Sequence, residues 1–180
     1  MEFTPTEVDG CWIIDLQPFT DERGFFARTF DPTEMAAHGI DTAVAQTSIA
    51  VNDRAGTLRG MHLQIEPHAE GKLVRCTRGT IVDACIDLRG ESPTFRRSVL
   101  VELSAENRRA LWIPPYCAHG YLTLTDDTEV SYQMSGPYAP AAARGVRYDD
   151  PALGLEWPAE VTVINERDRN WPDWDGTPLR

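Results

Sequence analysis

The sequence predicts an all-β fold, a sandwich or barrel of short strands with a few short helices. The first observation behind this prediction is a succession of β-rich segments, each bounded by Gly, Pro, Asn or Asp. The second is the spacing of the turn signals, about 8–12 residues, which is typical of all-β sandwiches and barrels. A chain of 180 residues has room for one sizeable core, so we expect a single domain, 1–180.

The expected strands follow one another along most of the chain. The segment Thr77–Thr80 contains Gly79 and is expected to form a hairpin turn, and Asp126-Asp127 a second turn. The strand segments are Trp12–Leu16, Phe25–Phe30, Ala43–Ser48, Thr57–Gln64, Leu73–Thr77, Thr80–Leu88, Ser98–Leu103, Ala110–Ile113, Gly120–Leu124 and Thr128–Met134.

One helix has a full set of local signals. Asp31 can cap its N-terminus, Pro32 suits the first helical position, Glu34 follows the cap by three residues, and Gly39 is expected to end the helix. With about two turns, this helix is peripheral to the predicted barrel.

The C-terminal tail, 148–180, has a different composition from the strand segments. It carries Trp157, Trp171 and Trp174 among several prolines. Large aromatic side chains gain free energy when they are buried, so we expect this tail to pack on the barrel.

Charge and cysteine content exclude several classes of function. Lys and Arg total 17 against 28 Asp and Glu, a formal net charge of −11, which disfavours nucleic acids and anionic membranes as partners. No apolar run is long enough to span a bilayer, and no secretory signal begins the sequence. The four cysteines, Cys11, Cys76, Cys85 and Cys117, lack the spacing of a zinc site, which indicates structural thiols in a reduced, cytoplasmic protein.

Two histidines lie in β-rich segments and are candidates for a functional site. Strand alternation puts His62 on one face and Arg59 on the other, unless Gly60 bends or bulges the strand. His119 lies before Gly120 in a second segment. Taken singly, each histidine can equally be a core imidazole with a satisfied hydrogen bond.

Other candidates are also ambiguous one by one. Lys72 is the only lysine beside 16 arginines, which suggests a task that a guanidinium cannot perform. Tyr132 alternates with apolar neighbours and so faces inward, where a core role is equally possible. Arg23 lies in a turn before an aromatic strand, and Asp168 is flanked by arginines in a segment that can also be a solvated charged turn.

Several motifs follow one another along the chain. They are Asp21-Glu-Arg-Gly-Phe-Phe26, Leu58-Arg-Gly-Met-His62 with Gln64, Gly71-Lys-Leu-Val-Arg75, Asp87-Leu-Arg89 with Ser92-Pro-Thr-Phe95, Glu102-Leu-Ser-Ala-Glu-Asn107, Trp112-Ile-Pro114 with Ala118-His-Gly120, Tyr132 with Tyr138, and Asp149-Asp-Pro151 with Trp157-Pro158. Taken together and in this order, these motifs resemble one known family, the dTDP-4-dehydrorhamnose 3,5-epimerases, which are sugar-nucleotide epimerases of the cupin (jelly-roll) superfamily. The resemblance covers roughly residues 3–172.

The resemblance implies a cupin-type jelly-roll barrel, a homodimer and a catalytic set. The substrate is then a dTDP-linked 4-keto-6-deoxy sugar whose carbons 3 and 5 flank the ketone. By resemblance, His62 is the base, Asp168 orients it, Tyr132 is the acid on the opposite face, and Lys72 stabilises the enolate oxygen.

The resemblance also implies the residues that bind the substrate. Arg59 and Arg23 hold the diphosphate, because guanidinium groups match phosphate oxygens, and His119 contacts a phosphate or the sugar. Phe26 and Tyr138 form stacking surfaces for the nucleobase. Arg28, Gln46 and Ser48 are further residues that line the site.

Some positions depart from the family pattern. Many relatives carry Glu at Arg28, Asp-Asn at Thr47-Ser48 and Lys at Gln133. These positions line or border the substrate site in the family, so the sugar accepted and the carbons inverted remain open. The first alternative is therefore a single-carbon epimerase of a natural-product deoxysugar pathway.

Two further alternatives come from other classes of protein. Many cupins hold a metal through His-x-His and a nearby Glu, and a metal-dependent oxygenase is one alternative. Here His62-Leu63-Gln64 lacks the second His, so the expectation is catalysis without metal or cofactor. The other alternative is a sugar-nucleotide binder without catalytic activity.

Overall fold

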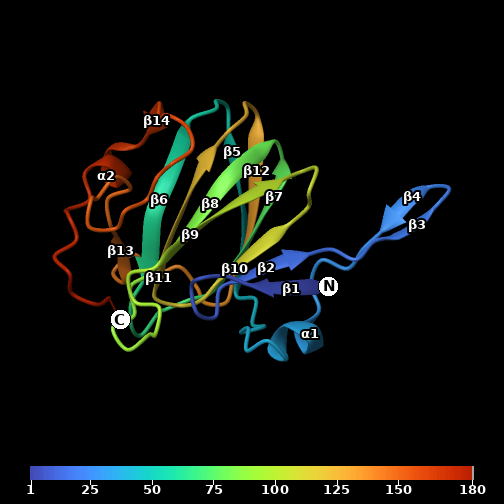
Figure 1. Ribbon diagram of the computed structural model, residues 1–180, viewed down its shortest axis with the longest axis horizontal. Coiled ribbons are helices and arrows are strands. Elements are labelled where there is room, and N and C mark those ends of the chain that lie inside the picture. Colours follow the sequence, from blue (N-terminus) through green and yellow to red (C-terminus); the bar gives the residue numbers. More distant parts are fainter. Residues whose placement is uncertain (180) are drawn as a thin grey trace.

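The computed structural model describes residues 1–179 and contains two antiparallel sheets that face each other (Figure 1). The first sheet has the order β1 (Glu2–Pro5), β2 (Trp12–Asp15), β10 (Ala110–Ile113), β7 (Lys72–Arg78), β12 (Thr128–Met134) and β5 (Gln46–Asn52). The second has the order β13 (Ala143–Gly145), β6 (Thr57–Gln64), β11 (Cys117–Thr123), β8 (Thr80–Asp87) and β9 (Ser98–Ser104), and β14 (Val163–Ile164) pairs in parallel with β6. The all-β, jelly-roll prediction is confirmed.

Most predicted strands lie within one residue of their predicted bounds, although β11 begins three residues before the predicted start at Gly120. The prediction Phe25–Phe30 is wrong beyond Phe26, because the chain there forms a short hairpin of β3 (Phe19–Asp21) and β4 (Gly24–Phe26). The prediction Ala43–Ser48 is displaced: the observed strand, β5, runs to Asn52, because its bounds are set by pairing with β12. The short strands β1, β3, β13 and β14 were not predicted. The last two pair with β6, far along the chain, whereas β1 and β3 pair with the strands that follow them.

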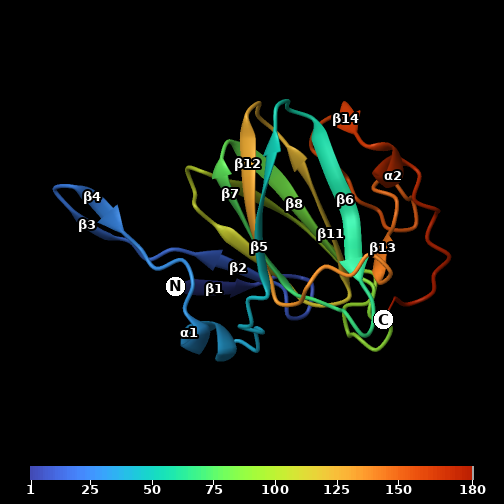
Figure 2. The same cartoon turned by 180° about the vertical axis from the view of Figure 1, so that it is seen from behind.

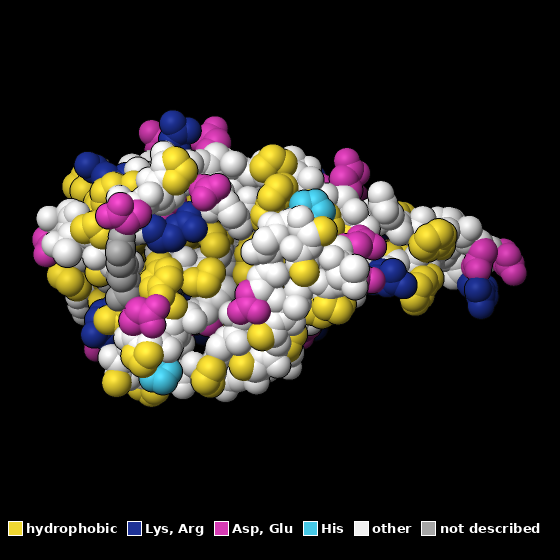
Figure 3. Space-filling model, turned by 90° about the horizontal axis from the view of Figure 1, so that it is seen from below, with side chains coloured by type: hydrophobic (Ala, Val, Ile, Leu, Met, Phe, Trp, Pro, Cys, Tyr) yellow, Lys and Arg dark blue, Asp and Glu magenta, His cyan; other side chains and the backbone are white. Residues whose placement is uncertain are grey.

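The hairpin β3–β4 projects from the barrel as a separate arm (Figures 1 and 2). Phe19 is 75% exposed and Phe26 is 71% exposed on this arm, which is unusual for aromatic side chains of this size. The space-filling view shows apolar and charged side chains together along it (Figure 3). Phe25 on the arm contacts the barrel through Arg108, whose guanidinium carbon lies 4.8 Å from the ring centroid, whereas Phe19 and Phe26 remain mostly in solvent.

The main core lies between the two sheets. Val74, Ile81, Leu103 and Val130 are among its fully or nearly fully buried side chains. All four cysteines belong to the same cluster and are free thiols. Burial raises the pKa of the Cys76 thiol to about 11, so this thiol stays protonated at neutral pH.

The predicted helix is confirmed as α1 (Pro32–Ala36). The Asp31 carboxylate accepts hydrogen bonds from the backbone N–H groups of Thr33 (2.9 Å) and Glu34 (3.2 Å), as an N-cap does. Gly39 follows the helix at a φ of +72°, a value that suits glycine. Met35 buries its side chain in a small cluster beside β2 and β10.

The C-terminal tail runs beside β6 and carries the second helix, α2 (Glu166–Arg169) (Figure 2). Trp157 and Trp174 pack on a cluster that includes Met61 and Leu88. The backbone N–H of Leu179 donates to the carbonyl of Leu88 at 3.1 Å. Within residues 1–179, no helix is both long and apolar enough to cross a membrane.

Candidate active site

His62 and Asp168 come from elements far apart in the sequence and meet at the edge of the barrel. The Nε2 atom of His62 on β6 lies 2.6 Å from Oδ1 of Asp168 on α2. Parallel pairing of β14 with β6 brings α2 to this position, and the Asn165 side chain caps the helix by accepting from the N–H of Asp168 at 2.7 Å. The fold therefore brings into contact two residues that the resemblance assigned to one site.

Contacts hold the Asp168 carboxylate in one orientation. Its second oxygen accepts from the N–H of Gly60 at 3.1 Å. Burial raises the pKa of Asp168, but the hydrogen bonds and the charge of His62 outweigh burial, so the pKa lies below its ordinary value. A carboxylate that stays ionised fixes the tautomer of its histidine and raises the basicity of the other ring nitrogen.

The expected irregularity at Gly60 is present. Arg59 pairs with Tyr121 and His62 pairs with His119, so β6 uses three steps where β11 uses two. Gly60 has a φ of +134°, and a Cβ there would lie 2.5 Å from the Cα of Gly120. A side chain is excluded at this position, which explains the glycine.

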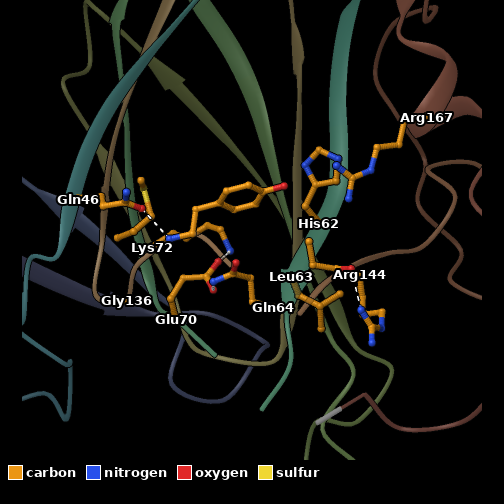
Figure 4. Close-up of a pocket in the computed structure, with 12 residues that line it drawn as sticks. Gln46, His62, Leu63, Gln64, Glu70, Lys72, Gly136, Arg144 and Arg167 are labelled. Carbon is orange, nitrogen blue, oxygen red and sulfur yellow. Dashed lines mark hydrogen bonds and ion pairs between the residues drawn. The ribbon is translucent and has the colours of Figure 1, made fainter. Parts of the chain in front are cut away.

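A pocket of about 280 Å³ lies beside this pair. Figure 4 shows Lys72 and Glu70 on one side of it and His62 with Arg167 on the other. The lining also contains Gln46 and Tyr138 from the predicted set, together with Leu63, Gln64, Met134, Gly136, Ala143 and Arg144. The pocket thus brings a histidine–carboxylate pair and a lysine to one space.

His119 and Tyr132 lie inside the barrel. Nε2 of His119 is 2.7 Å from Oδ1 of Asp83, and the rings of His119 and Tyr132 meet edge to face with centroids 6.3 Å apart. Burial raises the pKa of Tyr132 well above its ordinary value. Burial also raises the pKa of Asp83, although His119 opposes that shift. Tyr132 is therefore a neutral hydroxyl at neutral pH, and His119 is a buried ring held by a carboxylate.

Arg59 lies in a neighbouring depression of about 320 Å³. Its Nε donates to the side chain of Asn52 at 2.8 Å, and its Nη2 donates to the carbonyl of Val51 at 3.2 Å. Ser48 is exposed on β5, where it pairs in register with Tyr132. Neither residue lines the pocket beside His62.

The remaining predicted residues, Arg23, Phe26 and Arg28, lie on or just after the projecting hairpin. None of the three lines the pocket of their own chain, and Figure 1 shows the hairpin pointing away from the barrel. Arg23 instead forms a surface ion pair with Asp21 at 2.5 Å, and Arg28 lies 3.2 Å from Asp31.

Several lining residues were missed by sequence analysis. Glu70 lies two residues before Lys72 in an extended segment, a spacing that places both on one side. Arg167 precedes Asp168 directly and stacks on Trp171, with the guanidinium carbon 5.1 Å from the ring centroid. Both had a visible signal in their proximity to a predicted residue. Within residues 1–179, no group of three or more His, Cys, Asp or Glu side chains is placed to hold a metal.

Comparisons with known proteins agree on one family. The family model for dTDP-4-dehydrorhamnose 3,5-epimerase matches residues 5–176. The chain belongs to the dTDP-4-dehydrorhamnose 3,5-epimerase family. A relative of that name from Sinorhizobium fredii is 40% identical over 173 residues, which is 96% of this chain and 89% of the relative.

Solved structures show the same epimerase fold. The dTDP-4-dehydrorhamnose 3,5-epimerase of Elizabethkingia anophelis superimposes with a TM-score of 0.95 at 31% identity and covers 99% of both chains. A 3'-monoepimerase from Streptomyces bikiniensis, solved with dTDP-quinovose, has a TM-score of 0.84 at 35% identity, covering 93% of this chain and 85% of that one. The resemblance inferred from the motifs is confirmed, and this family member is an isomerase by class.

Proposed function

We propose that this epimerase inverts carbons 3 and 5 of a dTDP-linked 4-keto-6-deoxyhexose, converting dTDP-4-dehydro-6-deoxy-D-glucose to dTDP-4-dehydro-L-rhamnose. The observation that carries the proposal is the contact of 2.6 Å between His62 and Asp168 at a pocket that Lys72 also lines. A base with a fixed tautomer next to a cation is what enolate chemistry requires.

In the proposed reaction, His62 takes the proton from a carbon next to the ketone. The electron pair of that C–H bond forms the enolate, whose oxygen takes the charge opposite the Lys72 ammonium. Tyr132 then gives its proton to the other face of the carbon, and the carbonyl re-forms. His62 returns its proton to water and Tyr132 regains one, so the reaction consumes no oxidant or reductant and needs no cofactor.

The arginines and aromatic rings outside the pocket are proposed to bind the diphosphate and the nucleobase of the substrate. Arg59 borders the site, whereas Arg23 and Phe26 are carried away from it by their own hairpin. A homodimer in which each hairpin reaches the partner's site resolves this separation. The exposed Phe19 and Phe26, and the exposed Ile49 on the edge strand β5, support such an interface.

A single-carbon epimerase is the second candidate, favoured by the similarity to the Streptomyces 3'-monoepimerase. The two candidates share a base, an enolate and a nucleotide, and they differ only in how many carbons exchange their proton. Cytoplasmic location is also proposed, supported by four buried free thiols.

The experiment is to incubate the dTDP-4-keto-6-deoxyglucose substrate with the protein in D2O and to follow the sugar by NMR. Deuterium at carbons 3 and 5 supports the first candidate, and deuterium at carbon 3 alone supports the second. His62→Ala is expected to abolish exchange at both carbons while dTDP binding persists, and His68→Ala, a change of an exposed histidine, is the matched control. Absence of exchange with the unaltered protein rejects both candidates.

A further inference from the structure

Lys72 does not stand alone in the pocket. Its Nζ lies 2.6 Å from Oε1 of Glu70, and the side chains of both residues are nearly buried, with 12% and 6% of their surface exposed. Figure 4 shows the pair facing the interior of the pocket. Glu70 is the only carboxylate among the described residues that line this pocket. A buried carboxylate is retained only when its partners compensate for lost hydration, so its contacts define what it does.

The second oxygen of Glu70 is held as firmly as the first. Oε2 accepts from Nε2 of Gln64 at 2.5 Å. The same Nε2 lies within hydrogen-bonding distance of the carbonyl oxygens of His68 (2.9 Å) and Pro137 (3.1 Å), and the Oε1 atom of Gln64 accepts from the N–H of Ala139 at 2.6 Å. These partners fix the amide orientation of Gln64, because a flipped amide would place donors against donors and acceptors against acceptors.

Glu70 therefore has a donor on each side, the amide of Gln64 and the ammonium of Lys72. Only a group that accepts through both of its oxygens satisfies both neighbours, and among side chains that group is an ionised carboxylate. A glutamine at position 70 would turn its NH₂ group toward one of the two donors. The local network thus requires the charge of Glu70 as well as its shape.

We propose that Glu70 is the positioning residue for Lys72, with Gln64 as its anchor. This inference rests on the proposed function, in which the ammonium stabilises the enolate oxygen. One N–H of the ammonium is bound by Glu70, and two remain for the substrate oxygen. A flexible lysine held in advance loses less rotamer freedom when charge develops on that oxygen, so the contribution of Glu70 falls on turnover.

The test is a double-mutant cycle with Glu70→Gln, Lys72→Ala and the double variant, measuring kcat and KM for sugar epimerisation. Glu102→Gln, an exposed change of the same kind on β9, is the matched control. We expect Glu70→Gln to lower kcat about tenfold, the effect of one charge-assisted hydrogen bond, with KM changed less than about twofold. In the Lys72→Ala background the same change should alter kcat by less than about twofold.

The proposal would be overturned if the loss of kcat in the double variant equalled the product of the losses in the two single variants. Glu70 would then act independently of Lys72, for example on a sugar hydroxyl. An unchanged kcat in Lys72→Ala would also overturn it, although exchange of the substrate protons by the unaltered protein would still support the epimerase function. If Glu70→Gln fails to fold, Glu70→Asp replaces it in the cycle. Aspartate keeps both carboxylate oxygens as acceptors, but its side chain is one methylene group shorter. A loss of kcat that depends on Lys72 supports the proposal, and an independent loss overturns it.

Discussion

Tyr132, like an ordinary tyrosine, is protonated throughout the neutral pH range, and its surroundings raise its pKa further. Burial is the largest cause of its raised pKa, and the neighbouring Tyr121 adds to it. Its ring also contacts the imidazole of His119, which is held by Asp83 inside the barrel. A hydroxyl that keeps its proton until a strong base forms nearby suits a general acid that protonates an enolate carbon.

We expect Tyr132→Phe to separate proton loss from inversion. His62 is intact in this variant, so exchange of the substrate proton with D2O should continue, whereas the inverted product should form about 10²- to 10⁴-fold more slowly because the acid is missing. NMR measures both quantities in one sample. Tyr148→Phe, a change of a tyrosine in the C-terminal tail, is the control. Normal inversion in Tyr132→Phe would assign the acid to water or to another side chain.

Contacts within the chain explain the position of the hairpin β3–β4 less well than that of any other strand pair. It exposes Phe19 and Phe26 to solvent and carries Arg23 away from the pocket. A two-stranded hairpin is marginally stable by itself, and the proposed homodimer would give this hairpin a partner surface to pack on. The edge strand β5 exposes Ile49 and Val51 and offers such a surface on a second copy.

Arg23→Ala is expected to raise KM about tenfold or more with little change in kcat, since a lost bidentate phosphate contact weakens binding. Arg97→Ala, an exposed change on the barrel, is the control. Mixing the Arg23→Ala and His62→Ala proteins should restore some sites with the unaltered KM. In each mixed dimer one site then has an intact His62 and an intact arginine from the partner, whereas the other site lacks both. Light scattering at twice the chain mass should accompany this result, and a monomer that retains full activity would contradict it.

The stability of the whole molecule in acid depends on its buried carboxylates, one of which organises the loop after β8 and another of which joins α2 to β6. Asp87, at the end of β8, accepts from Nε and Nη2 of Arg89, both at 2.8 Å, and from the hydroxyls of Ser92 and Thr94. Burial raises the pKa of Asp87, but these hydrogen bonds lower it below its ordinary value of 3.8. Asp168 has a lowered pKa for a similar reason.

A carboxyl group whose pKa is lower in the folded state contributes stability that is complete above its unfolded pKa and is lost as the pH falls through the folded value. We therefore expect the free energy of unfolding to be nearly constant between about pH 7 and pH 5 and to fall below about pH 4. Urea titrations across this range provide the measurement.

Asp87→Asn identifies the source of this pH dependence. We expect it to lower the free energy of unfolding by about 2–3 kcal/mol at neutral pH and to flatten the loss below about pH 4. Asp53→Asn, a change of an exposed carboxylate, should do neither. An unchanged acid limb in Asp87→Asn would assign the loss of stability to other groups.

The fold class and the central strands could be predicted from the amino-acid sequence alone. Thr57–Gln64, Ala110–Ile113 and Thr128–Met134 have the predicted bounds, because strand alternation and turn residues are local properties. The cap at Asp31 and the need for a bulge at Gly60 are local as well. The order of the motifs was sufficient to indicate the family.

Only the tertiary structure decided which of these residues act together. His62 meets Asp168 across 106 positions of sequence because β14 pairs with β6. Gln64 joins Glu70 to the segment after β12, a contact that strand patterns do not encode. The hairpin that carries Arg23 is paired locally, but its direction away from the barrel is a property of the folded chain. Strand register and loop docking depend on partners far along the chain, whereas a sequence pattern reports only on its near neighbours.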